Sequence, residues 1–146
     1  MRSINEFMEG DHRHCDDLFA DVEQAVATQV WDLATAAFSR FQNAMQQHFS
    51  AEEEILFPAF EARSGMVGGP TQVMRDEHVQ MNALMAQAMA AISAKDAEEY
   101  GGNAETLLIM MQQHNMKEEH VLYPMCDEHL RDQVDALLLS LLNKVQ

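Results

Sequence analysis

The chain has 146 residues, of which 47% are apolar, and a formal net charge of −15 from 24 acidic and 9 basic side chains. This length suits one domain with its own core, and such negative charge excludes nucleic acid and anionic membranes as expected partners. No stretch approaches the roughly 20 apolar residues of a transmembrane helix, and the first residues lack the apolar core of a signal peptide. Because Cys15 and Cys126 have no framework spacing, we expect a cytoplasmic location.

The composition favours helices, because Ala, Leu, Met, Gln and Glu dominate and β-branched residues are scarce. A first helix is predicted from about residue 4 to 27, with apolar residues at helical spacing. The second begins near Trp31 and continues until Pro58, which should kink it or end its regular part. After a central loop, the glycines and proline at 68–70 introduce a third helix that runs to about residue 93.

A fourth helix is predicted to begin after Asp96, because Asp96 and Glu99 resemble a capping box. Pro124 lies near its end, and an apolar segment at 132–145 predicts a short packing helix. Four helices of about 25 residues joined by short turns make an up-down-up-down bundle. We therefore expect an all-α fold, namely an up-down-up-down four-helix bundle with a short additional C-terminal helix, as a single domain over residues 1–146.

An internal repeat relates the two halves of the chain when the sequence is shifted by 66 residues. The matched residues are His12 with His78, His48 with His114, Glu52-Glu53 with Glu118-Glu119, and the segment 55–58 with 121–124. Four of the seven histidines take part in the repeat. We therefore expect equivalent residues to face each other across the core, related by a pseudo-two-fold axis.

Each half of the repeat contains a histidine followed four residues later by a glutamate, His48 with Glu52 and His114 with Glu118. This spacing puts both side chains on one helix face. Burying them costs several kcal/mol unless their charges are compensated, and a pair of metal ions provides that compensation. The candidate metal ligands are His12, His48, Glu52, His78, His114 and Glu118. Surface His–Glu pairs are the common alternative, but two pairs in a duplicated frame favour a metal site. Imidazole and carboxylate without thiolate suit iron, with manganese or zinc as alternatives.

This order of histidines and glutamates resembles the hemerythrin-like (HHE cation-binding) family over the chain up to about residue 127. The resemblance implies a four-helix bundle with a non-haem di-iron centre, in which the four histidines are terminal ligands. It also implies that Glu52 and Glu118 bridge two iron ions, which share an oxo or hydroxo bridge. Oxygen-carrying members have a fifth histidine where this chain has Asn82. They place the last carboxylate five residues after its histidine, which makes Glu119 a rival to Glu118.

The resemblance implies binding of dioxygen or a related small ligand, such as nitric oxide or peroxide, for sensing, delivery or detoxification. The missing fifth histidine leaves more coordination positions open, which motivates turnover of peroxide or nitric oxide as an alternative. Iron storage, or iron donation for the repair of iron centres, is a third hypothesis, because the family includes four-histidine repair proteins. We assign no catalytic residue, so enzymatic activity stays open. Signalling would require an unidentified protein partner.

The remaining polar candidates lie outside this ligand set. Three histidines fall outside the repeat and are expected at the surface. They are His14, His120 and His129. Asp16 lies four residues after His12 and is a candidate to orient that imidazole. Tyr123, which the repeat matches to Phe57, is expected to pack at the end of the bundle, with hydrogen bonding to a bound oxygen species as the alternative.

Overall fold

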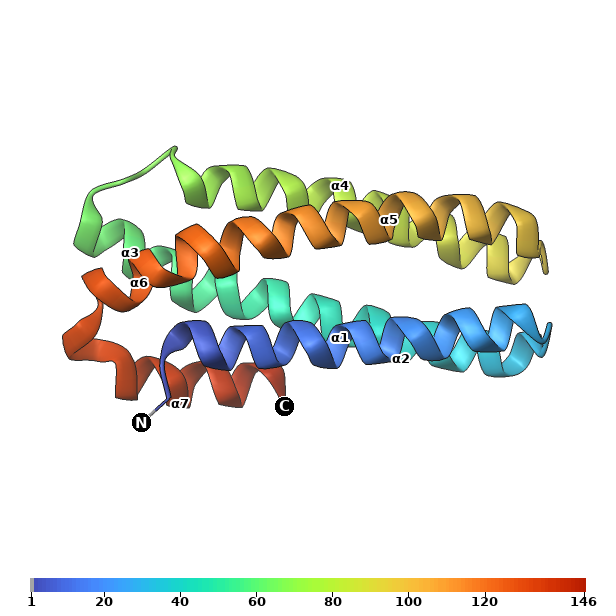
Figure 1. The fold of residues 1–146 in the computed structure, drawn as a ribbon, viewed down its shortest axis with the longest axis horizontal. Coiled ribbons are helices and arrows are strands. Elements are labelled where there is room, and N and C mark those ends of the chain that lie inside the picture. The colour runs from blue at the N-terminus through green and yellow to red at the C-terminus, as the bar shows by residue number, and fades with distance from the viewer. Residues whose placement is uncertain (1) are drawn as a thin grey trace.

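The computed structural model describes residues 2–146, and within this range it contains helices and no strands. Four long helices form two antiparallel hairpins, drawn as the lower and upper pairs in Figure 1. The first hairpin consists of α1 (Ile4–Ala27) and α2 (Trp31–Ala51), and the second of α4 (Pro70–Ser93) and α5 (Ala97–Lys117). This arrangement confirms the expected all-α, up-down-up-down bundle.

The two hairpins turn in the same way, as the repeat predicts. Each turn contains one non-glycine residue in the left-handed region, Gln29 with φ 55° and its repeat partner Lys95 with φ 56°. The helix that follows Lys95 begins as expected, because the Asp96 side chain accepts a hydrogen bond of 3.0 Å from the Glu99 backbone N–H. The duplication therefore extends from side chains to backbone conformation.

The second helix of each hairpin leaves the α-helical register at equivalent places. A π-helical turn, η1 (Glu52–Leu56), follows α2 and leads into α3 (Phe57–Ser64). Its repeat partner η2 (Glu118–Leu122) follows α5 and leads into α6 (Tyr123–His129). Pro58 and its equivalent, Pro124, lie in the first turns of α3 and α6, directly after the π-helical turns. The irregularity expected at Pro58 therefore begins before the proline, in η1.

The chain ends with a short 3₁₀ turn, η3 (Arg131–Gln133), and helix α7 (Val134–Val145), which confirms the expected C-terminal helix. Helix α7 packs against α1 and α2, and it runs beside the N-terminal part of α1 (Figure 1). Leu141 is its one fully buried side chain. No helix in residues 2–146 combines the length and apolar character that crossing a membrane requires.

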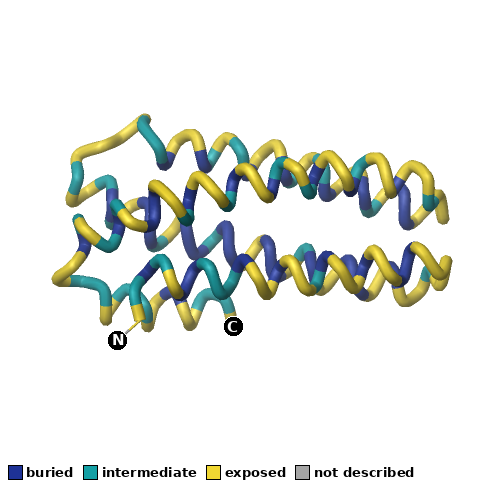
Figure 2. The backbone as a smooth tube through the Cα atoms, viewed as in Figure 1, coloured by how far each residue is buried: buried dark blue, intermediate teal, exposed yellow. Residues whose placement is uncertain are grey.

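The apolar core consists of two clusters, and buried residues line the space between the hairpins along the bundle (Figure 2). The cluster towards the hairpin turns includes Phe19, Phe38 and Phe41, whose rings pack edge to face. The other cluster joins α3, α6 and α7 and includes Phe60 and Leu122. Each fully buried side chain of this size contributes about 1.5–3 kcal/mol to folding. The candidate site lies between these two clusters.

Candidate metal centre

The six candidate ligands lie together inside the bundle. They are His12 on α1, His48 on α2, Glu52 in η1, His78 on α4, His114 on α5 and Glu118 in η2. None of them exposes more than 4% of its surface. The duplication therefore brings one histidine from each long helix, and one glutamate from each π-helical turn, to the same place.

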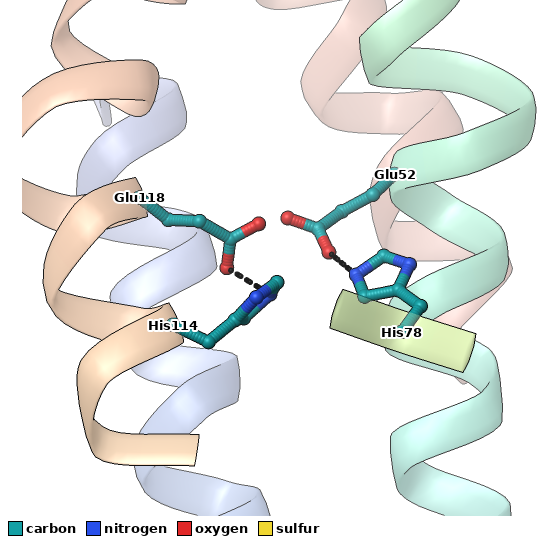
Figure 3. A group of neighbouring side chains, drawn as sticks. All are labelled: Glu52, His78, His114 and Glu118. Atoms are coloured by element: carbon teal, nitrogen blue, oxygen red, sulfur yellow. Dashed lines mark hydrogen bonds and ion pairs between the residues drawn. The ribbon is translucent and has the colours of Figure 1, made fainter. Parts of the chain in front are cut away.

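Four of these residues form one compact group, with ligand atoms that lie within 4.8 Å of one another. Figure 3 shows Glu52 and Glu118 approaching from opposite sides, each beside one imidazole. His78 Nε2 lies 3.0 Å from Glu52 Oε1, and His114 Nε2 lies 3.3 Å from Glu118 Oε1. Two nitrogens and two carboxylates thus converge on one position.

His12, His48 and Glu118 form a second group with the same mutual spacing. His12 Nε2 lies 3.1 Å from Glu118 Oε1, and His48 Nε2 lies 3.6 Å from Glu52 Oε1. Glu118 belongs to both groups, and its Oε1 lies near an imidazole of each, His12 and His114. The resemblance implied that Glu52 and Glu118 are both shared, and of the two only Glu118 belongs to both groups.

Glu118 and Glu119, the two rivals left open by the sequence, point in different directions. Glu118 is completely buried and faces the centre. Glu119 keeps 24% of its side chain exposed and places Oε2 2.6 Å from His12 Nδ1, on the outer side of the ring. Glu119 therefore orients an imidazole, whereas Glu118 occupies the position of a ligand.

All four imidazoles have a carboxylate at their outer nitrogen. The Nδ1 partners are Glu119 for His12, Asp11 for His48 at 2.7 Å, Glu53 for His78 and Glu77 for His114 at 2.8 Å. An Nδ1–H that donates to a carboxylate leaves the Nε2 lone pair free for a metal and fixes the ring orientation. At His12 this partner is Glu119 from another helix and not the expected Asp16, whose side chain is exposed. The four carboxylates could have been identified from the sequence, because the repeat matches Asp11 with Glu77 and Glu53 with Glu119.

Without a cation, protons balance the buried carboxylates. Burial opposes protonation of His12, but hydrogen bonds to Glu118 and Glu119 raise its pKa to about 10. Burial also opposes protonation of His114, yet the charge of Glu118 raises its pKa to about 9. The pKa of Glu52 is raised by burial and by the neighbouring charge of Glu118. The centre thus holds concentrated negative charge that a cation can neutralise in place of protons.

Two polar atoms of the centre lack a hydrogen-bond partner in the described part of the chain, and a bound cation would supply them with an interaction instead. His114 Nε2 and Glu118 Oε2 are buried and have no hydrogen-bond partner among residues 2–146. An unsatisfied buried polar atom costs about 1–3 kcal/mol. The set of imidazole nitrogens and carboxylate oxygens without thiolate suits iron, manganese or zinc. The residues present therefore fit a bound cation of this kind.

The position of Tyr123 fits the alternative considered for it, hydrogen bonding at the centre, better than packing at the bundle end alone. Its hydroxyl lies inside the centre, 2.7 Å from Glu52 Oε2 and 2.9 Å from Glu118 Oε1. Burial and the charges of these two carboxylates raise the pKa of Tyr123 well above its usual range. Packing at the bundle end is thus an incomplete description of this residue. The available signal was the Phe57–Tyr123 pair, where the repeat replaces an apolar ring by a polar one.

The histidines outside the repeat lie away from the centre. His14 and His120 are exposed, as expected. His129 is partly buried, and its ring packs edge-on against Phe60 with the ring centres 5.4 Å apart. Cys15 and Cys126 are free and buried in the two apolar clusters, where they pack as small apolar side chains.

Comparison with known proteins adds a family to this geometry. Residues 3–126 match the family model described as hemerythrin HHE cation binding domain. Neither a curated protein nor a solved structure matches the chain. The match spans both halves of the repeat and all six buried histidines and glutamates, which fit a cation site. The chain belongs to the hemerythrin HHE cation-binding family.

Proposed function

We propose that the protein holds two iron ions and binds dioxygen or a related small ligand, for sensing, delivery or detoxification. The iron would be held by the four Nε2 atoms of the candidate histidines and by Glu52 and Glu118. The observation that carries this proposal is that Glu118 belongs to two groups of converging donor atoms. When bound, iron supplies reversible redox chemistry and open positions for a diatomic or peroxidic ligand.

The residues around the centre support this function by holding the donors ready. The carboxylates at the outer imidazole nitrogens fix ring orientation, so that little rearrangement is needed when cations bind. The apolar clusters above and below keep bulk water from the centre. Phe49 stacks on His78 with the ring centres 3.9 Å apart, which covers one face of that imidazole. A small apolar ligand such as dioxygen suits these surroundings better than a large polar substrate does.

The side chain at the position of the missing fifth histidine favours a second candidate function, turnover of peroxide or nitric oxide. Asn82 Oδ1 accepts a hydrogen bond from Gln46 Nε2 on the neighbouring helix. Asn82 therefore supplies no fifth imidazole to the centre. With four histidines, coordination positions on the metal stay open to a reactant from solution. Peroxide consumption no faster than that of the same amount of free iron would count against this candidate.

The proposal is tested by metal content and optical spectroscopy of the purified protein. We expect two irons per chain, and an absorption spectrum that changes when the reduced protein is exposed to oxygen. Bands that vanish when oxygen is removed would indicate reversible binding, and bands that persist would favour the turnover chemistry. Variants His48→Ala and His114→Ala should lose iron, whereas His14→Ala, at an exposed histidine, should keep it. If iron content is unaffected in the first two, the di-iron centre is disproved.

A further inference from the structure

One position of the repeat differs inside the centre, where Phe57 in the first half corresponds to Tyr123 in the second. Besides the two carboxylates, the Tyr123 hydroxyl oxygen lies 3.2 Å from His12 Nε2 and 3.3 Å from His48 Nε2. It therefore contacts donor atoms of every residue in the His12–His48–Glu118 group. The phenol oxygen can accept hydrogen bonds from imidazole N–H groups, but it has one hydrogen to donate and lies within hydrogen-bond distance of two carboxylates.

The spacing of these atoms is that of neighbouring ligands around one cation. Nitrogen and oxygen ligands lie about 2.0–2.2 Å from a metal such as zinc, which separates adjacent donor atoms by roughly 2.8–3.6 Å. Tyr123 Oη lies 2.9 Å from Glu118 Oε1, and His12 Nε2 lies 3.1 Å from the same oxygen. The contacts of Tyr123 with the two imidazoles fall in the same interval. Tyr123 Oη thus lies at the spacing of a neighbouring ligand from each of the three donors of this group.

The other half of the centre has no such oxygen. Phe57 stacks near His78 with the ring centres 6.1 Å apart, and Phe49 stacks on the same imidazole. Neither phenyl ring carries a donor atom. That position is completed by Glu52, which belongs to the His78–His114 group and not to the His12–His48 group. The fourth protein donor therefore differs between the two positions.

We propose that Tyr123 is a metal ligand, which binds the cation at the His12–His48 position as a phenolate. This inference rests on the proposed di-iron function. Coordination replaces the phenolic proton by the cation, and one proton is released to solvent. Because phenolate favours ferric over ferrous iron, the two iron positions would be chemically unequal although the histidines around them are duplicated.

The experiment uses the fact that the chain has two tyrosines. Tyr100, the second one, is buried among apolar residues near Phe38, and its hydroxyl has no hydrogen-bond partner in residues 2–146. In the Tyr100→Phe variant every tyrosine signal comes from Tyr123. This variant is produced with ring-deuterated tyrosine, loaded with ferrous ions without oxygen, and oxidised in air. We expect visible phenolate-to-iron absorption and resonance Raman bands that shift with the isotope.

Tyr123→Phe provides the complementary measurement. We expect this variant to keep its helical circular dichroism, to lose the phenolate bands, and to bind one of its two irons at least about tenfold more weakly in competition with a chelator. Two bound irons without isotope-sensitive bands in Tyr100→Phe would overturn the role of Tyr123 and leave the di-iron function standing. Absence of iron from the wild-type protein would overturn both proposals.

Discussion

The His12–His48 half of the centre and the His78–His114 half have equivalent polar residues but different rings around them. Each imidazole has a carboxylate at Nδ1, and the four carboxylates correspond pairwise in the repeat. At His78 the repeat positions carry Phe49 and Phe57, whereas at His12 they carry Asn115 and Tyr123. The duplication thus preserves the histidines and their carboxylate partners, whereas the rings that pack around them differ between the halves. Identical donor sets therefore need not give equivalent metal positions.

Removal of Glu118 should break both halves at once, because it is the carboxylate that they share. We expect Glu118→Ala to lower iron content from two ions per chain to less than one, since both positions lose a donor. Glu119→Ala is the comparison: it removes the carboxylate that orients His12, so it should bind iron more weakly than the wild type but still take up two ions when iron is in excess. Metal analysis after gel filtration measures this difference. Loss of iron from the Glu119 variant alone would identify Glu119 as the ligand instead.

Substitution at the repeat pair Phe49 and Asn115 should show the unequal packing of the halves. Phe49 is 4% exposed and stacks on His78, so Phe49→Ala is expected to lower the free energy of unfolding by about 3–5 kcal/mol. Asn115→Ala, at a partly exposed position, should change it by no more than about 0.5 kcal/mol. Urea unfolding of the metal-free protein measures both. Equal losses would show that the two positions are packed alike.

Neutralising the outer carboxylates should affect the halves equally. Glu53→Gln and Glu119→Gln each remove the charge that orients one imidazole, so each should weaken iron binding about 10–100-fold. Glu54→Gln serves as the control, because Glu54 pairs with Lys144 at the surface. Competition with a chelator measures the affinities. A strong effect in one half only would mean that the preserved carboxylates do not have equivalent roles.

A further pair of carboxylates holds the start of the first helix in each half. Asp127 accepts hydrogen bonds from the backbone N–H groups of Ile4, at 2.8 Å, and of Asn5, at 3.1 Å. Asp127→Ala should therefore cost about 1 kcal/mol, as the loss of a helix cap does. Glu128→Ala, at an exposed neighbour, is the control for urea unfolding. An unchanged stability of the Asp127 variant would contradict this capping role.

Glu61, the repeat partner of Asp127, should give the smallest effect, one that depends on pH. A hydrogen bond from Arg75 holds the pKa of Glu61 below its usual value of 4.5. The ionised carboxylate therefore stabilises the native state above pH 4.5 and ceases to do so as the pH falls through the lower folded-state pKa. The stability difference between the metal-free wild type and Glu61→Gln should shrink accordingly. A difference independent of pH would indicate a purely steric effect of Glu61.

Much of the fold and of the centre could be predicted because the repeat supplies two kinds of information. Helical spacing put His48 and Glu52 on one face, and the shift of 66 residues linked them to the second half. Capping at Asp96 and the breaks before Pro70 located the helix starts. These predictions depend on local rules that tertiary contacts did not override.

The position of the Tyr123 hydroxyl between Glu52 and Glu118 does not follow from α-helical geometry, because it depends on a π-helical turn. In an α-helix a residue five positions after Glu118 lies about 140° around the axis from it. In η2 the Tyr123 N–H instead donates to the Glu118 carbonyl, five residues back, and both side chains reach the centre. The prolines after η1 and η2 indicate an irregularity but not its type. The choice between Glu118 and Glu119 was open for the same reason, since it required knowing the helical register.

The register of the helix that leads into each π-helical turn makes the centre depend on the number of residues as well as on their identity. Each turn accommodates one more residue per hydrogen-bonded loop than an α-helix does. A deletion inside η2 would be absorbed by a return to α-helical geometry, whereas deletion of one residue between His114 and Glu118, in the regular part of α5, would rotate η2 and α6 by about 100° relative to His114. Glu118 and Tyr123 would then turn away from His114 although both residues are still present in the chain. A one-residue deletion that a surface loop would tolerate should therefore act here as a complete loss of one side of the site.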